Sequence, residues 1–203
     1  MRHNRTIDEL WLWQARAFEE FCAVAAMVAL HTLPGAKLIA AAPLNFLEEQ
    51  DRGRWLAHDN PLGVFYLARQ KRVIEVQHRP DGISKARRDF GAPIWLRIGD
   101  LDNARGFQQR VAIWPLAGPS GGLVDGEAEL LAPALERAGR NDLVRAGLII
   151  RSASPEDDTA SRHLVKSGPA RILTTTLAPA GPALRDGIAG IAEFVAEQIA
   201  LEG

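Results

Sequence analysis

The sequence has a single cysteine, Cys22, so no disulfide can form within the chain. Lysine is also scarce, with four residues against twenty arginines, so an arginine at any one position carries little information. The longest uncharged apolar run, residues 21–30, has ten residues, half of the ~20 that span a bilayer. Two glutamates precede that run, where a secretory signal would carry positive charge. These absences predict a soluble, cytoplasmic protein with no membrane segment.

Several signatures of cofactor and metal binding are missing as well. There is no G-x-x-x-x-G-K-[ST] loop, no G-x-G-x-x-G segment after a strand, no C-x-x-C pair and no H-E-x-x-H helix. The five histidines are scattered, and their spacing gives no reason to expect a zinc site. No cofactor is identifiable from the sequence, and Mg²⁺ would enter only with a nuclease activity.

The chain does have a globular composition: 203 residues, 47% hydrophobic and 24% charged. A chain of this length buries roughly 70% of its unfolded surface and needs no metal or disulfide to fold. A capping box at residues 6–9 predicts a helix that runs to about His31 and stops before Pro34. The second half of that helix is apolar on nearly every face. It is therefore either central or covered by a second copy of the chain, which makes a homo-oligomer plausible.

Hydrophobic periodicity over the rest of the chain predicts an α+β fold. The expected strands are 37–42, which should be buried, 64–68, 72–77, 94–98, 110–116, 148–151 and 171–177. The expected helices are 44–58, 127–138, a short one at 142–145, one beginning at the cap of residues 154–157, and 182–201. The long N- and C-terminal helices should pack on a mixed sheet of five to seven strands. Its middle third should be an antiparallel β-meander, with a βαβ-like unit near the C-terminus.

The uncharged segment 117–122, with three glycines, is the best candidate for a linker. It divides the chain into a helix-plus-meander part, residues 1–116, and an α/β part, residues 123–203. The sequence leaves open whether the two parts are separate or pack as a single domain around a shared sheet.

Charge is unevenly distributed along the chain. Residues 52–99 carry ten bases and four acids, a net charge of +6, between two acidic segments. Unless those acids neutralise it, such a segment is a candidate surface for a phosphate- or carboxylate-bearing partner. The leading hypothesis is a binding or regulatory protein that recognises an anionic small molecule or a nucleic acid through residues 69–88. The expected anion-binding residues are Arg69, Lys71, Arg72, Arg79, Lys85, Arg87 and Arg88.

A second hypothesis is a Mg²⁺-dependent nuclease. Asp59 opens one predicted strand, and Glu75 and Gln77 lie on the next strand of the same hairpin. Two carboxylates on one edge of the hairpin could hold Mg²⁺, which would activate water and neutralise a phosphodiester. The arrangement resembles the core of restriction-type nucleases, which implies that Glu48 or Glu49 completes the set. Gln77 stands where that pattern usually has lysine.

A third hypothesis is a serine hydrolase. Residues 118–122 match the G-x-S-x-G pattern of a nucleophile elbow at Ser120, with a predicted strand before it and a helix after it. The downstream chain loosely resembles the later part of an α/β-hydrolase, which implies the order Ser120, then Asp157 or Asp158, then His163. That family carries its histidine on a loop, whereas His163 is predicted inside a helix. A Gly–Ser linker accounts for the same residues, so the sequence leaves open whether the protein is an enzyme.

Overall fold

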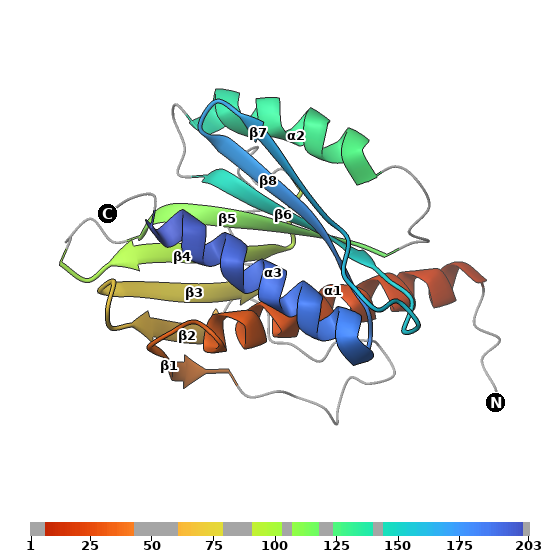
Figure 1. Ribbon diagram of the computed structural model, residues 1–203, viewed down its shortest axis with the longest axis horizontal. Helices are drawn as coiled ribbons and strands as arrows, with labels where there is room; N and C mark the ends of the chain where they lie inside the picture. The colour runs from red at the N-terminus through yellow and green to blue at the C-terminus, as the bar shows by residue number, and fades with distance from the viewer. Residues whose placement is uncertain are drawn as a thin grey trace.

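The computed structural model describes residues 7–42, 61–78, 91–102, 107–117, 124–139 and 144–200. Within these residues, three helices pack on one mixed sheet of eight strands (Figure 1), which confirms the predicted α+β fold. The helices are α1 (Ile7–His31), α2 (Val124–Gly139) and α3 (Gly181–Ala200). The strands are β1 (Ala36–Ala41), β2 (Pro61–Leu67), β3 (Arg72–His78), β4 (Ile94–Asp100), β5 (Phe107–Leu116), β6 (Val144–Ser152), β7 (Arg162–Ser167) and β8 (Ala170–Leu177).

The sheet combines an antiparallel half and a mixed half, in the order β1-β2-β3-β4-β5-β6-β8-β7. Strands β2 to β5 form the predicted antiparallel meander, and β1 extends it by pairing antiparallel with β2. The chain then passes through α2 to β6, which runs parallel to β5. Strand β8 is parallel to β6, and β7 pairs antiparallel with β8 at the edge of the sheet. Strands from before and after the predicted linker therefore belong to one sheet.

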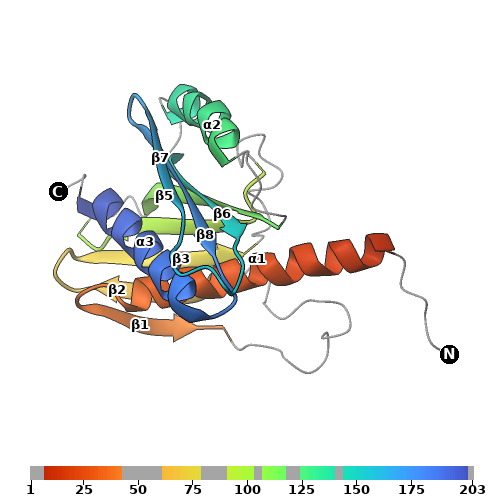
Figure 2. The same ribbon diagram turned by 45° about the vertical axis from the view of Figure 1, so that its right-hand side comes forward.

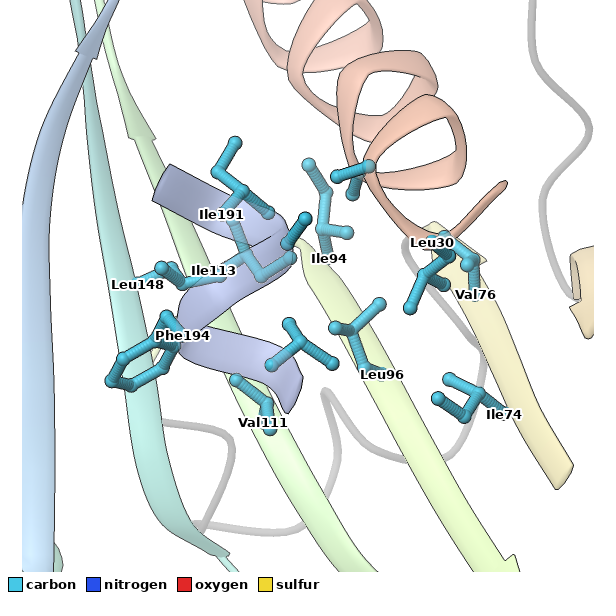
Figure 3. Packing of buried hydrophobic residues seen from close by; sticks show 14 of the residues in the cluster. Leu30, Ile74, Val76, Ile94, Leu96, Val111, Ile113, Leu148, Ile191 and Phe194 are labelled. Carbon is cyan, nitrogen blue, oxygen red and sulfur yellow. The ribbon is translucent and has the colours of Figure 1, made fainter. Parts of the chain in front are cut away.

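The helices cover opposite faces of the sheet. Side chains of α1 and α3 pack on the inner residues of the central strands, as Figure 3 shows for Leu30 of α1 and Phe194 of α3. Helix α2 packs on the other face, where Ala132 and Leu135 belong to a cluster with Ile149. In Figure 2 the N-terminal part of α1 extends beyond the sheet. Among the described helices, none is both long enough and apolar enough to cross a membrane.

Strand pleating explains this division, because successive side chains of a strand point to opposite faces. On β4, Ile94, Leu96 and Ile98 lie in the cluster under α1 and α3, whereas Trp95 lies in the cluster with α2. The sheet face under α1 and α3 is called the inner face below, and the other is called the outer face. Where the pairing has no register shift, a residue directly opposite one of these side chains lies on the same face.

The helix predicted to begin at Ser154 is not formed, so that prediction is wrong. The cap hydrogen bonds do exist: the Glu156 amide donates to Ser154 Oγ, and the Ser154 amide donates to Asp157 Oδ2. The chain then continues as β7, because β7 pairs with β8 around a two-residue turn. Gly168 takes the first turn position with φ of +53°, which glycine adopts without strain. A cap marks where a helix can begin, and here the strand pairing prevailed.

Two further expectations need correction. Val144 and Arg145 begin β6, so they do not belong to the short helix predicted at 142–145. Strand β1 forms where predicted, but the prediction that it is buried is wrong, since Ile39 is 59% exposed. Among the described strands, β1 is at the edge of the sheet with β2 as its one neighbour, which leaves its side chains exposed. The predicted helix 44–58 and residues 118–122 lie outside the described residues.

The helix that connects two parallel strands lies elsewhere in the chain than predicted. The sequence predicted a helix between the strands that are now β6 and β8. In the structure the helix of the βαβ unit is α2, which connects β5 to β6. The connection from β6 to β8 contains β7 instead.

Candidate anion-binding site

Three charged side chains lie in a row across the outer face of the meander. Glu75 of β3 is opposite Arg97 of β4, and Arg97 is opposite Arg110 of β5. Directly opposed residues on antiparallel strands have Cβ atoms ~5 Å apart and share a face of the sheet. The neighbours of Arg97 on β4, Leu96 and Ile98, lie in the core under α1 and α3, which assigns the row to the outer face.

Glu75 is held in place by two hydrogen-bond donors. Arg97 Nη1 donates to Glu75 Oε2 at 3.1 Å, and Gln77 Nε2 donates to the same oxygen at 3.3 Å. The side chains of Arg97 and Glu75 are only 28% and 18% exposed, and Gln77 is buried. Partial burial lowers the local dielectric, which strengthens such contacts and makes an unmatched charge expensive. Glu75 therefore orients the Arg97 guanidinium from one side of the row.

Arg110 lies on the other side of Arg97, and in the described part of the chain no carboxylate pairs with it. The residue is half-buried, and its Nε is buried without a hydrogen bond. A shielded guanidinium loses hydration, and here no acceptor compensates the loss. Like charges directly opposite each other on neighbouring strands also repel. An anion bound at both guanidinium groups would relieve the desolvation and the repulsion together.

The structure partly tests the geometry of the nuclease hypothesis. Glu75 and Gln77 do share one face of β3, as the hypothesis requires, whereas Asp59, Glu48 and Glu49 lie outside the described residues. Glu75 Oε2 already accepts hydrogen bonds from the Arg97 guanidinium and the Gln77 amide, which compete with Mg²⁺ for that oxygen. Within the described residues, no three His, Cys, Asp or Glu side chains gather as a metal site.

The predicted basic segment 69–88 is described only as far as His78. Lys71 Nζ lies 2.8 Å from Asp102 Oδ2, and this hydrogen bond raises the pKa of Lys71. Arg72 Nη1 lies 3.6 Å from Asp100 Oδ2. Both acids come from the end of β4 and the turn after it, so these bases are already paired. Arg69 is exposed in the β2–β3 turn, and the remaining predicted residues, Arg79, Lys85, Arg87 and Arg88, lie outside the described residues.

The structure describes the aspartates and the histidine of the hydrolase hypothesis but not its serine. Ser120 lies outside the described residues. His163 is an exposed residue of β7 opposite Thr174, so the expectation that it lies in a helix is wrong. The Asp157 carboxylate accepts the Ser154 amide in the turn before β7. The order of these residues in the chain therefore remains the main support for this hypothesis.

A buried polar contact that the sequence did not indicate connects α1 to the end of β3. Glu19 Oε1 and His78 Nε2 lie 2.6 Å apart, with side chains 11% and 2% exposed. Cys22, one turn further along α1, is completely buried. Desolvation, with a smaller contribution from Glu19, raises the pKa of the Cys22 thiol well above its usual range. The thiol therefore stays protonated and behaves as a small core side chain.

Sequence reasoning also missed Arg97 and Arg110. Each is the one arginine of its strand and lies at an outward position, and arginine is common throughout this chain. The available signal was alternation, because a charge between core residues of a central strand must lie on the opposite face. That signal places each arginine on a face, but it does not pair the two.

The sequence matches no protein-family model and no curated protein. Two adjacent guanidinium groups provide several N–H donors in planar forks that match the oxygens of a carboxylate or a phosphate. The arrangement suits recognition of such a group.

Proposed function

We propose that the protein binds an anionic ligand on the outer face of the meander, through Arg97 and Arg110. The observation that carries the proposal is the half-buried Arg110 guanidinium, beside Arg97 in register, with no acceptor among the described residues. A strand position of this kind favours a side chain that is neutral or paired. A charged residue that is unfavourable in the free protein is typical of a binding site, where the ligand supplies the missing interaction.

The two arginines have different roles in this proposal. Arg97 is oriented by Glu75, and Gln77 holds Glu75 in turn, so Arg97 is preorganised before a ligand arrives. Arg110 Nε is buried without a hydrogen bond, and Arg110 supplies the charge that the ligand neutralises. Charge-assisted hydrogen bonds to a guanidinium are roughly twice as strong as neutral ones, and partial burial strengthens them further.

The proposal keeps the predicted class of partner and moves the site. Anion recognition was expected at residues 69–88, where Lys71 and Arg72 are now seen to be paired with acids. The row on the outer face takes the place of that segment as the centre of binding. The nuclease remains a separate prediction, and plasmid cleavage with Mg²⁺ that is lost in Glu75→Ala would support it.

Replacing Arg110 tests the proposed function directly. Inorganic phosphate and malonate would be added to wild type, Arg110→Gln and Arg185→Gln at constant ionic strength, with thermal unfolding as the readout. Arg185 is an exposed arginine on α3 and serves as the matched control. An anion at ten times its Kd stabilises the folded state by about 1.4 kcal/mol, a rise in Tm of ~3–6 °C.

We expect wild type and Arg185→Gln to be stabilised equally and Arg110→Gln to show no shift. Without anion, Arg110→Gln should unfold no earlier than wild type, because it removes an unmatched charge. Equal stabilisation of all three proteins would contradict the proposed site. Arg110→Gln binding normally while unfolding early would assign Arg110 a structural role instead.

A further inference from the structure

The row on the outer face is short. Beyond Glu75, the residue opposite on β2 is Val64, and beyond Arg110 the residue opposite on β6 is Val144. The charged positions therefore end after three neighbouring strands. A surface that follows a nucleic acid backbone needs bases spread over a longer path, because such proteins make several phosphate contacts.

The positions above and below the row are also mostly uncharged. On β4, Arg97 lies between Trp95 and Gly99, the outer-face residues on either side of it. Trp95 belongs to a buried cluster with Ala112, the outer-face residue that follows Arg110 on β5. On β3, Gln77 lies beside Glu75 and adds a polar group there. The two guanidinium groups thus form a small charged area within an uncharged part of the sheet.

The row is recessed as well as short. Arg97 and Glu75 keep 28% and 18% of their side-chain surface, and Arg110 Nε is fully shielded. A phosphate of a long backbone must approach together with its neighbours, whereas a single carboxylate or phosphate on a small molecule can enter alone. Glu75 at one end of the row would repel a second phosphate placed beside the first.

We infer, resting on the proposed function, that the ligand is a small molecule with one carboxylate or phosphate group held by both arginines, and not a nucleic acid. The charged group lies between Arg97 and Arg110 and accepts hydrogen bonds from their terminal nitrogens. Gln77 and Glu75 keep Arg97 in position. Carboxylate and phosphate share the two-oxygen edge that a guanidinium recognises, so both are used as probes.

The test compares compact and polymeric anions on the same proteins. Binding of inorganic phosphate and of benzoate would be measured by isothermal titration calorimetry. Binding of a labelled single-stranded oligonucleotide and of its duplex would be measured by fluorescence anisotropy. Wild type, Arg110→Gln, Arg110→Lys and the Arg185→Gln control would be titrated at ~50 and ~200 mM salt. A protein that contacts six to ten phosphates loses roughly a thousandfold or more of its affinity over that range.

We expect at least one compact anion to bind wild type, with less than about a tenfold loss across the salt range. Arg110→Gln should weaken the binding of that anion at least tenfold. The affinity of Arg110→Lys should lie between those of wild type and Arg110→Gln, because an ammonium keeps the charge and loses the planar fork. The preferred compact probe tells whether the natural group is a carboxylate or a phosphate.

Two outcomes would overturn the inference in different ways. Tight, steeply salt-dependent binding of the oligonucleotide that is lost in Arg110→Gln would reject a small ligand and leave the proposed site intact. Absence of Arg110-dependent binding for every probe would reject the inference together with the proposed function.

Discussion

Gly187 of α3 is the position where one methyl group tests how closely the helix packs on the sheet. A Cβ added there would lie 2.5 Å from the carbonyl oxygen of Thr176 and 2.6 Å from Cδ2 of Leu177. Thr176 is held in β8 by its pairing with β6, and its amide donates to the carbonyl of Ser161. That oxygen cannot move away, so α3 would have to shift outward by roughly 1 Å to restore ordinary contact.

The expected magnitude follows from two opposing effects. Helix propensity favours alanine over glycine by ~1 kcal/mol, so propensity alone predicts a more stable protein. Overpacking of a tight core site costs about 1–3 kcal/mol, and an outward shift also loosens the fully buried Ile191 and Val195. We expect Gly187→Ala to lower the free energy of unfolding by ~1–2 kcal/mol and Tm by ~2–8 °C.

Urea unfolding followed by circular dichroism measures this change, provided that the m-value stays constant. The control is Ala189→Gly at an exposed position of the same helix, which should lose only the propensity difference of ~1 kcal/mol. A Gly187→Ala protein that is more stable than wild type would refute the close approach of α3 to β8. It would mean that propensity governs both positions.

Three other predictions follow from the packing. Gly147→Ala should destabilise the protein and shift its tryptophan emission, because the new Cβ would overlap the Trp114 ring. Arg151→Gln should cost ~1–3 kcal/mol in urea unfolding, since Arg151 Nη2 donates to both carboxylate oxygens of Glu127 and connects β6 to α2. Cys22 should react with Ellman's reagent only when α1 detaches. Its raised pKa stabilises the fold below the unfolded thiol pKa of ~8.5, and that contribution is lost as the pH rises through the folded value.

For each of these three predictions, one result would contradict the expected packing. Unchanged Tm and emission in Gly147→Ala would mean that Trp114 does not pack over β6. If Arg151→Gln and Glu127→Gln had additive effects in a double-mutant cycle, the two side chains would not interact. Rapid labelling of Cys22 in the native protein, at the rate of an exposed thiol, would show that α1 is not packed on the sheet.

Local signals were enough for much of the fold. The capping box and Pro34 bracket α1, and its predicted end at His31 is confirmed. The alternating segments of the meander and the apolar face of α3 were also recognisable, because periods of 2 and 3.6 residues are properties of the chain itself. The N-cap at Ser154 was misleading because it is a local signal. Pairing with a strand elsewhere in the chain, here β8, can prevail over it.

The candidate site was harder to foresee. Glu75 and Gln77 were chosen for their spacing on one strand, and they do share a face. Lys71 and Arg72 were chosen for charge, and the structure pairs them with acids about thirty residues further along the chain. Arg97 and Arg110 were overlooked, since nothing in their local sequence distinguishes them from the other arginines.

The order of residues already specified which segments are helical or extended and which side chains alternate toward a core, because those preferences act over a few neighbouring positions. Long-range pairing specified the rest. The β7–β8 hairpin replaced a capped helix, and the register of β3, β4 and β5 placed Arg97 between Glu75 and Arg110. Contacts between strands depend on the whole sheet being assembled. Only the folded structure therefore shows that the Nε of Arg110 is buried without a hydrogen bond.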